Sequence, residues 1–156
     1  MAGHVTTSAL ILSPEGDQVL MIHDNENDSL RQPWSHYEGG NSLKQSARRE
    51  GMEKAGVTAL NDHPWTTAND CPFDIDTHVI DANTPKVEAA HVHHDVLFVF
   101  QADPMAMLKP QMDDVSLSCW FPVEVLKDCG DARLKRLHAK LLEEGLAKAP
   151  SKNMRP

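Results

Sequence analysis

The feature that most constrains this chain is a polar turn that runs into a short, capped helix. Ser42 and Gln45 have the spacing of a capping box, and Gly56 stands where such a helix would end. Inside the helix, Glu50 and Glu53 are three residues apart, so both carboxylates leave the same face. Paired carboxylates on a rigid element, entered from a glycine-containing loop, predict a site for a hard divalent cation such as Mg²⁺.

The same stretch resembles the signature of the Nudix hydrolases. That signature reads Gly, five residues, Glu, seven residues, Arg-Glu, an apolar residue, any residue, Glu-Glu, any residue, Gly and an apolar residue. Five residues occupy signature positions: Arg49, Glu50, Glu53, Gly56 and Val57. The residues that this family commonly has in the loop and at the start of the helix are also present, as His36, Glu38, Gly40, Ser42 and Leu43. The resemblance implies an α/β fold, a Nudix-like α/β/α sandwich with a mixed central sheet.

Four signature positions depart from the pattern. Ser35 replaces the first glycine, Asn41 the first glutamate, Gly51 the apolar residue and Lys54 the second member of the Glu-Glu pair. Lys54 matters most, because an ammonium group cannot coordinate a metal at neutral pH. One interpretation is a solvated Glu50–Lys54 ion pair, worth about 0.2–0.5 kcal/mol, on a helix that has lost its metal. The other is a metal site that keeps fewer ions and takes substitute ligands from elsewhere.

Length and charge narrow the class of protein. The 156 residues fit a single Nudix-like domain over residues 1–149, and we expect residues 150–156 to form a disordered tail. A net charge of −8 disfavours nucleic acid and anionic membranes as partners. Three cysteines without zinc-like spacing, no signal peptide and no bilayer-spanning apolar run predict a cytoplasmic protein. The oligomeric state is left open, and a homodimer is allowed.

Apolar patterning predicts the elements around the capped helix. Residues 5–12 and 18–23 form a hairpin across a Pro-Glu-Gly-Asp turn, and residues 96–100 form a buried strand. Asp131 caps a last helix, on which an apolar stripe packs inward and basic residues face water. The stripe is Leu134, Leu137 and Leu141, and the basic residues are Arg133, Lys135, Arg136 and Lys140.

Two further segments carry alternating aspartate and histidine. The first row is Asp74, Asp76 and His78, and the second is His91, His93 and Asp95. Side chains two apart share one face of a strand, and the loop at residues 81–90 would join the strands as an antiparallel pair. The rows would then lie side by side, with His94 on the opposite face.

Imidazole and carboxylate are common ligands of divalent metals, so the two rows are candidates for a metal site. The alternative is a solvent-facing polar row, which many sheets carry at this period. A branch of Nudix-like proteins has a similar Phe-Asp-Ile-Asp-x-His segment followed by His-x-His-x-Asp and an aromatic residue, as at residues 73–78 and 91–98 here.

The resemblance implies a metal-dependent hydrolase that cleaves the pyrophosphate bond of a nucleoside diphosphate linked to another moiety, with an atypical metal site. The catalytic residues would be Glu50, Glu53 and Arg49, where Arg49 orients a glutamate. Mg²⁺ or Mn²⁺, or another divalent metal bound through the rows, would be held by Glu50, Glu53, His91, His93 and Asp95. A small nucleotide-like substrate would be contacted by His36, Glu38, Asp76, His78 and Asp114, the last in an acidic loop.

Two other functions stay open. One is an inactive Nudix-fold protein that binds a nucleotide or regulates a partner, since signature glutamates are lost at Asn41 and Lys54. The other is a transition-metal-binding protein that uses the His and Asp rows. The sequence does not identify the substrate, because the loops at residues 24–32 and 81–90 carry no pattern that indicates a base or a sugar.

Overall fold

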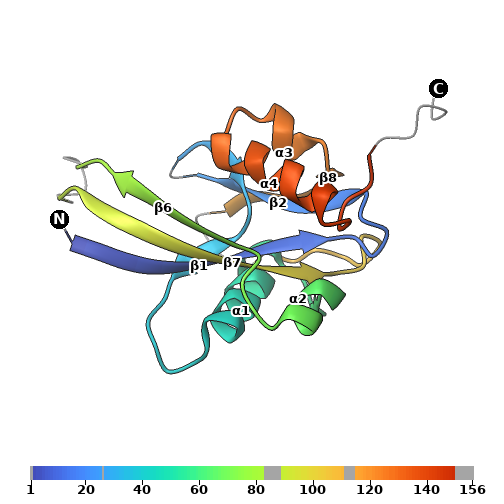
Figure 1. Ribbon diagram of the computed structural model, residues 1–156, viewed down its shortest axis with the longest axis horizontal. Helices are drawn as coiled ribbons and strands as arrows, with labels where there is room; N and C mark the ends of the chain where they lie inside the picture. The colour runs from blue at the N-terminus through green and yellow to red at the C-terminus, as the bar shows by residue number, and fades with distance from the viewer. Residues whose placement is uncertain (1, 26, 83–88, 111–114, 150–156) are drawn as a thin grey trace.

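The computed structural model describes residues 2–25, 27–82, 89–110 and 115–149, and places a mixed sheet between two layers of helices (Figure 1). The strands are β1 (Ala2–Leu12), β2 (Gln18–Asp24), β3 (Ser29–Arg31), β4 (Trp34–His36), β5 (Asn61–Asp62), β6 (Asp74–Ile80), β7 (His91–Gln101) and β8 (Val115–Pro122). The helices are α1 (Leu43–Ala55), α2 (Pro64–Asn69), α3 (Val125–Asp128) and α4 (Ala132–Glu143). The expected tail at residues 150–156 and the candidate Asp114 lie outside the described residues.

Strand β1 is the centre of the sheet. It runs parallel to β7 along its whole length and antiparallel to β2 and β4. The main strand order is β3-β2-β1-β7-β5, with β8 added to β2 and β6 added to β7. The predicted hairpin is therefore confirmed as β1 and β2, and so is the mixed character of the sheet.

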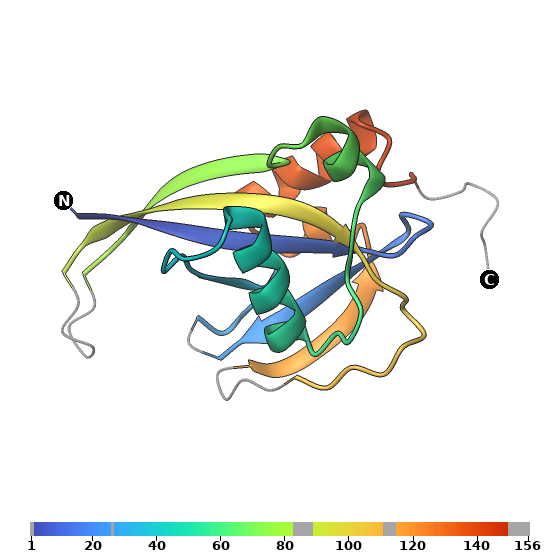
Figure 2. The same ribbon diagram turned by 90° about the horizontal axis from the view of Figure 1, so that it is seen from below.

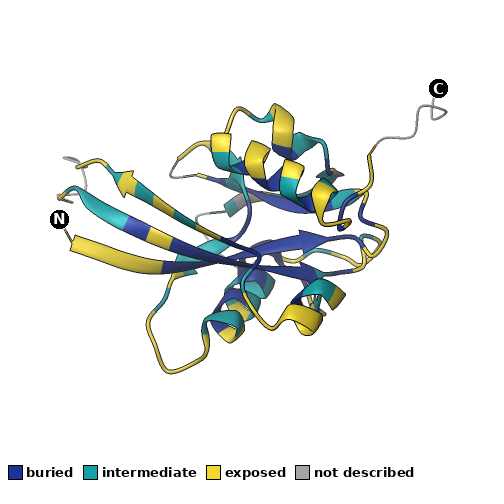
Figure 3. Ribbon diagram, viewed as in Figure 1, coloured by how far each residue is buried: buried dark blue, intermediate teal, exposed yellow. Residues whose placement is uncertain are grey.

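The apolar run of β1 is continuous because both faces of the sheet are covered. Leu10 and Leu12 pack into the core under α4, whereas Ala9 and Ile11 pack into the core under α1. The sheet is buried where the helices cover it and exposed towards the end where β1 begins (Figure 3). This layering is the predicted α/β/α sandwich.

Helix α1 lies across the sheet and begins and ends as predicted (Figure 2). Ser42 and Gln45 form both hydrogen bonds of the capping box, and Gly56 ends the helix in the left-handed conformation with φ of 73°. A Cβ atom added to Gly51 would lie 2.8 Å from the Cβ of Ala9. The missing apolar residue of the signature thus has a steric cause, because α1 packs too closely on β1 to admit a side chain.

Helix α4 confirms the apolar stripe and corrects the expectation for its basic residues. Asp131 caps the helix by accepting from the Leu134 N–H, and the three stripe leucines are buried. The Arg133 side chain, however, is only 12% exposed. Lys140 donates to the carbonyl of Phe73 and lies 4.7 Å from the centre of its ring. Arg136 bonds to Asp74 and Asp76 of β6. Three of the four basic side chains therefore turn towards the sheet, because acceptors on β6, β7 and the segment before β6 draw them in.

Candidate functional site

The two rows of aspartate and histidine lie side by side, as their alternation predicted. Strands β6 and β7 pair antiparallel, with Asp76 opposite Asp95 and His78 opposite His93. His94 is on the other face of the sheet, where its Nδ1 lies 3.0 Å from the Thr77 hydroxyl. The period-two argument therefore assigned each side chain to its correct face.

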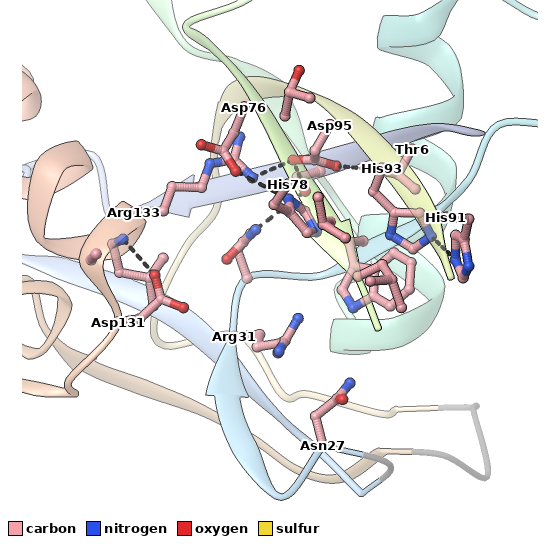
Figure 4. Close-up of a pocket in the computed structure, with 18 of the residues that line it drawn as sticks. Thr6, Asn27, Arg31, Asp76, His78, His91, His93, Asp95, Asp131 and Arg133 are labelled. Carbon is pink, nitrogen blue, oxygen red and sulfur yellow. Dashed lines mark hydrogen bonds and ion pairs between the residues drawn. The ribbon is translucent and has the colours of Figure 1, made fainter. Parts of the chain in front are cut away.

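The rows form one wall of a cleft of about 1170 Å³ on the α4 face of the sheet (Figure 4). Helix α4, β1 and the segment from residue 27 to β4 supply the other walls. The lining includes the predicted residues His36, Asp76, His78, His91, His93 and Asp95, together with Thr6, Ser8, Arg31, Gln32, Trp34, Arg133 and Arg136. A cleft of this size and polarity can accept a nucleotide-sized ligand.

Asp95 lies at the base of the cleft, and both of its carboxylate oxygens already accept hydrogen bonds. Its Oδ1 accepts from the Thr6 hydroxyl at 2.6 Å. Its Oδ2 accepts from the Ser8 hydroxyl at 2.6 Å and from Nη1 of Arg133 at 2.6 Å. These bonds fix α4 to the sheet, and they favour a structural role for Asp95 over the metal-ligand role expected from the sequence.

The first row is also bound to α4. Buried Asp74 accepts from Nε of Arg133 at 3.2 Å and from both terminal nitrogens of Arg136 at 2.6 and 3.1 Å. Asp76 accepts from Arg136 at 3.2 Å and lies 3.1 Å from Nδ1 of His78. The two rows are thus neither a plain solvent-facing face nor a set of free carboxylates, because arginines from a distant helix occupy most of their oxygens.

Histidine gathers at the outer end of the cleft. His93 is 6% exposed, and its ring centre lies 4.8 Å from that of His91, 5.1 Å from that of His36 and 5.6 Å from that of His78. Burial, followed by the charges of the neighbouring imidazoles, lowers the pKa of His93 to about 4. This imidazole is therefore neutral at pH 7.

The signature carboxylates lie on α1, the helix on the other face of the sheet. Glu50 is partly buried and lies 3.7 Å from Nη2 of Arg49. With its amide turned to satisfy both atoms, Asn41 accepts from Nη1 of the same arginine at 3.1 Å. The residues that line the cleft do not include Glu50 or Glu53, nor the exposed Glu38. The two predicted groups of site residues therefore lie in separate places.

The position of the Lys54 side chain contradicts the interpretation of a solvated ion pair with Glu50. It is 9% exposed, donates to the carbonyl of Trp34, and its Nζ lies 5.3 Å from the centre of the Trp34 ring. No ion pair between Lys54 and Glu50 is found in the described part of the chain. The ammonium is engaged beneath the indole that lines the cleft, because a carbonyl oxygen and an aromatic face both attract a cation.

Several residues of the cleft were missed from the sequence. The hydroxyls of Thr6 and Ser8 line the cleft from β1. The imidazole of His4 continues their alternation and lies beside His91 at the rim, because β1 runs parallel to β7. This alternation can be read from the sequence, but only the pairing of β1 with β7 shows that these residues lie beside the row on β7. Arg31 gave no spacing pattern, and the helical pattern assigned Arg133 to the side that faces water.

As it stands, no set of three or more His, Cys, Asp or Glu side chains in the described ranges is arranged to hold a metal ion. No helix in those ranges is both long and apolar enough to cross a membrane.

Known proteins resemble this chain in fold. A Nudix hydrolase from Clostridium perfringens matches with a TM-score of 0.62 and 19% identity over 90% of this chain and 97% of the other. A C. elegans Ap4A hydrolase matches with a TM-score of 0.65 and 16% identity over 90% and 96%. A bifunctional NMN adenylyltransferase/ADP ribose pyrophosphatase from Francisella tularensis, complexed with AMP and a Mn ion, matches with a TM-score of 0.56 and 22% identity over 91% and 42%.

Among curated proteins, none matches this chain. The sequence profile of the NUDIX domain matches residues 3–144, which is most of the chain. The mixed sheet between helix layers, the capped helix with Glu50 and Glu53, and this match agree with one another. The chain therefore belongs to the Nudix family.

Proposed function

We propose that this Nudix-family chain is a metal-dependent hydrolase that cleaves the pyrophosphate bond of a nucleoside diphosphate linked to another moiety. The observation that carries the proposal is the position of Lys54. Because this ammonium is engaged with Trp34 and does not pair with Glu50, it would leave Glu50, together with Glu53, to bind an ion. The cleft, whose lining residue Trp34 contacts Lys54 of α1, would receive the remainder of the substrate.

Two carboxylates are a sufficient donor set for the implied ion. Mg²⁺ is usually held by one or two carboxylates, with substrate phosphates and waters as its other ligands. Glu50 and Glu53 leave the same face of α1 and would hold Mg²⁺ or Mn²⁺. When bound, the ion would supply neutralisation of pyrophosphate charge and activation of a water nucleophile.

The chain's own residues would position the reacting groups. Arg49, 3.7 Å from Glu50 and bonded to Asn41, would hold the Glu50 carboxylate in place so that it can act as a ligand or as the general base. In the cleft, Arg31 would attract phosphate oxygens. His36, Asp76 and His78 line the same space and would contact the nucleoside or the linked moiety. Glu38 and Asp114 remain predicted substrate contacts.

A cytoplasmic location also belongs to this proposal. Cys71, Cys119 and Cys129 are free thiols, as expected of a protein kept in a reducing compartment.

The test is product release from a panel of nucleoside diphosphate derivatives, with Mg²⁺, with Mn²⁺ and with a chelator. We expect turnover by the wild type that requires the metal and that Glu53→Gln abolishes. Glu143→Gln, an exposed change on α4, is the matched control and should keep the wild-type rate.

Two outcomes would contradict the proposal. Substrate binding without turnover would identify a nucleotide-binding or regulatory protein instead. Turnover that survives in Glu53→Gln would place the chemistry away from α1.

A further inference from the structure

Five imidazoles from four strands meet at the outer end of the cleft, and we call them the histidine cluster: His4, His36, His78, His91 and His93. Distances between neighbouring ring centres run from 4.8 Å for His91 and His93 to 6.2 Å for His4 and His93. Figure 4 shows His78, His91 and His93 turned towards one another from β6 and β7. The hydrolysis proposed above does not require five imidazoles in one place.

Hydrogen bonds set the tautomer of two members of the cluster. Nδ1 of His91 lies 2.9 Å from the carbonyl oxygen of Ala89, which can only accept, so Nδ1 carries the proton. Nδ1 of His78 lies 3.1 Å from Oδ2 of Asp76 and donates in the same way. In both rings Nε2 is left with its lone pair. A histidine that donates one N–H to a carbonyl or carboxylate and presents the other nitrogen is the usual arrangement of a metal ligand.

Two nitrogens of the cluster are already spaced for chelation. Nε2 of His91 and Nε2 of His93 lie 3.0 Å apart. Two nitrogens bound at 2.0–2.1 Å to one metal are about 2.9 Å apart at a right angle and about 3.3 Å apart at the tetrahedral angle. The same distance also fits a single N–H···N hydrogen bond, which is the alternative that the experiment must separate.

Further ligands would come from the rim of the cluster. As described above, no complete ligand group is preformed among the described residues. His4 is exposed and the His78 side chain is 40% exposed, so both rings can turn about their side-chain torsions. Their ring centres lie 5.1 Å from His91 and 5.6 Å from His93 respectively. Asp95 is not counted among these ligands, because its oxygens already accept from Thr6, Ser8 and Arg133.

We propose that the histidine cluster binds one transition-metal ion, such as Zn²⁺, Ni²⁺ or Co²⁺, through Nε2 of His91 and His93, through Nε2 of His78 with its bond to Asp76 kept, and through the rotated ring of His4. An all-imidazole donor set selects these ions over Mg²⁺, whereas the carboxylates of α1 select hard ions. The cluster is therefore a second site with its own metal preference. It does not depend on the hydrolase proposal, and its occupancy is measured without any substrate.

The experiment is a titration of the full chain, purified without a histidine tag and treated with a chelator. Co²⁺ binding is followed by its visible absorption, and Zn²⁺ and Ni²⁺ binding by calorimetry, with excess Mg²⁺ as a competitor. We expect one equivalent of each transition metal per chain, unaffected by Mg²⁺. His91→Ala should abolish stoichiometric binding. His94→Ala changes an exposed histidine on the opposite face of the same strand and should bind as the wild type does.

Two further variants keep the test decisive if His91→Ala does not fold by circular dichroism. Asp76→Asn removes the carboxylate that orients His78, and should weaken binding by about 10- to 100-fold. His4→Ala changes an exposed ring and should weaken binding or alter the Co²⁺ spectrum. Glu53→Gln should leave binding unchanged.

The proposal is overturned by any of three results. These are the absence of stoichiometric binding by the wild type, binding that persists in folded His91→Ala, and loss of binding in His94→Ala or Glu53→Gln. The last variant also separates the two proposals, since it removes hydrolysis and spares the cluster.

Discussion

The two faces of the sheet use carboxylates in opposite ways. On the α4 face, Asp74 and Asp95 are buried and their oxygens accept from arginines and hydroxyls. On the α1 face, the contact that Glu50 makes among the described residues is a 3.7 Å approach to the adjacent Arg49. Satisfied carboxylates hold the fold together, whereas loosely paired ones can still bind an ion or move a proton. Burial and hydrogen-bond partners, not residue type, distinguish the carboxylates that stabilise the fold from those that can take part in chemistry.

The sharpest test of this comparison is Glu50→Gln. The amide keeps the shape of the side chain and removes its charge and basicity. We expect turnover to fall by about 10²- to 10⁴-fold, the contribution of a positioned acid–base group. The free energy of unfolding should change by no more than about 0.5 kcal/mol. Steady-state kinetics and urea unfolding measure the two effects. A large loss of stability with normal turnover would reverse the roles of the two faces.

The opposite outcome is expected for Asp95→Ala. Removing the carboxylate leaves Arg133 as a mostly buried cation without one of its partners, and breaks the bonds from Thr6 and Ser8. A loss of about 3–5 kcal/mol in the free energy of unfolding follows, measured by urea titration. Exposed Glu143→Ala is the control and should stay within about 0.5 kcal/mol of the wild type. A loss below about 1 kcal/mol for Asp95→Ala would show that the network adds little to stability.

An intermediate effect is expected for Arg136→Gln. This side chain is 48% exposed, and Asp74 keeps its bond to Arg133 when Arg136 is removed. We expect a loss of about 1 kcal/mol in the free energy of unfolding, well below that of Asp95→Ala. Equal losses in the free energy of unfolding for Arg136→Gln and Asp95→Ala would show that burial does not determine how much each ion pair contributes to stability.

The smallest effect is expected for Asp62→Asn. Partial burial alone would raise the pKa of Asp62, but the hydrogen bond from Lys44 and the charge of Arg48 lower it below 3.8. A lowered pKa stabilises the folded state above the ordinary pKa, and this stabilisation is lost as the pH falls through the folded value. Asp62→Asn should cost at most about 1 kcal/mol at pH 7 and flatten the decline in stability below about pH 4. Urea unfolding across pH would contradict this if the two curves stayed parallel.

The sequence predicted those parts of the molecule that depend on local periodicity. The alternation of β6 and β7 placed His78 beside His93 and His94 on the far face. The capping box and Gly56 set the ends of α1. These patterns can be identified in the sequence because neighbouring residues determine the direction of each side chain.

The remaining features depend on contacts between distant segments. Arg133 meets Asp95 across 38 residues, and Lys54 meets the Trp34 carbonyl across 20. Neither pair has a local spacing that distinguishes it from a basic residue facing water. The same limit hid His4 from the histidine cluster, since only the parallel pairing of β1 with β7 brings it there. Which carboxylates were free could therefore be predicted only once the tertiary contacts were known.

The burial of Lys54 beneath Trp34 constrains how this chain can be changed by successive substitutions. Lys54→Glu alone would set a carboxylate against the Trp34 carbonyl oxygen, so two acceptors would face each other in a buried position. The signature glutamate could return only after the backbone near Trp34 had changed its path. Reversion at this position is thus conditional on an earlier change elsewhere, a form of epistasis. Any attempt to introduce the signature glutamate at this position must respect that order.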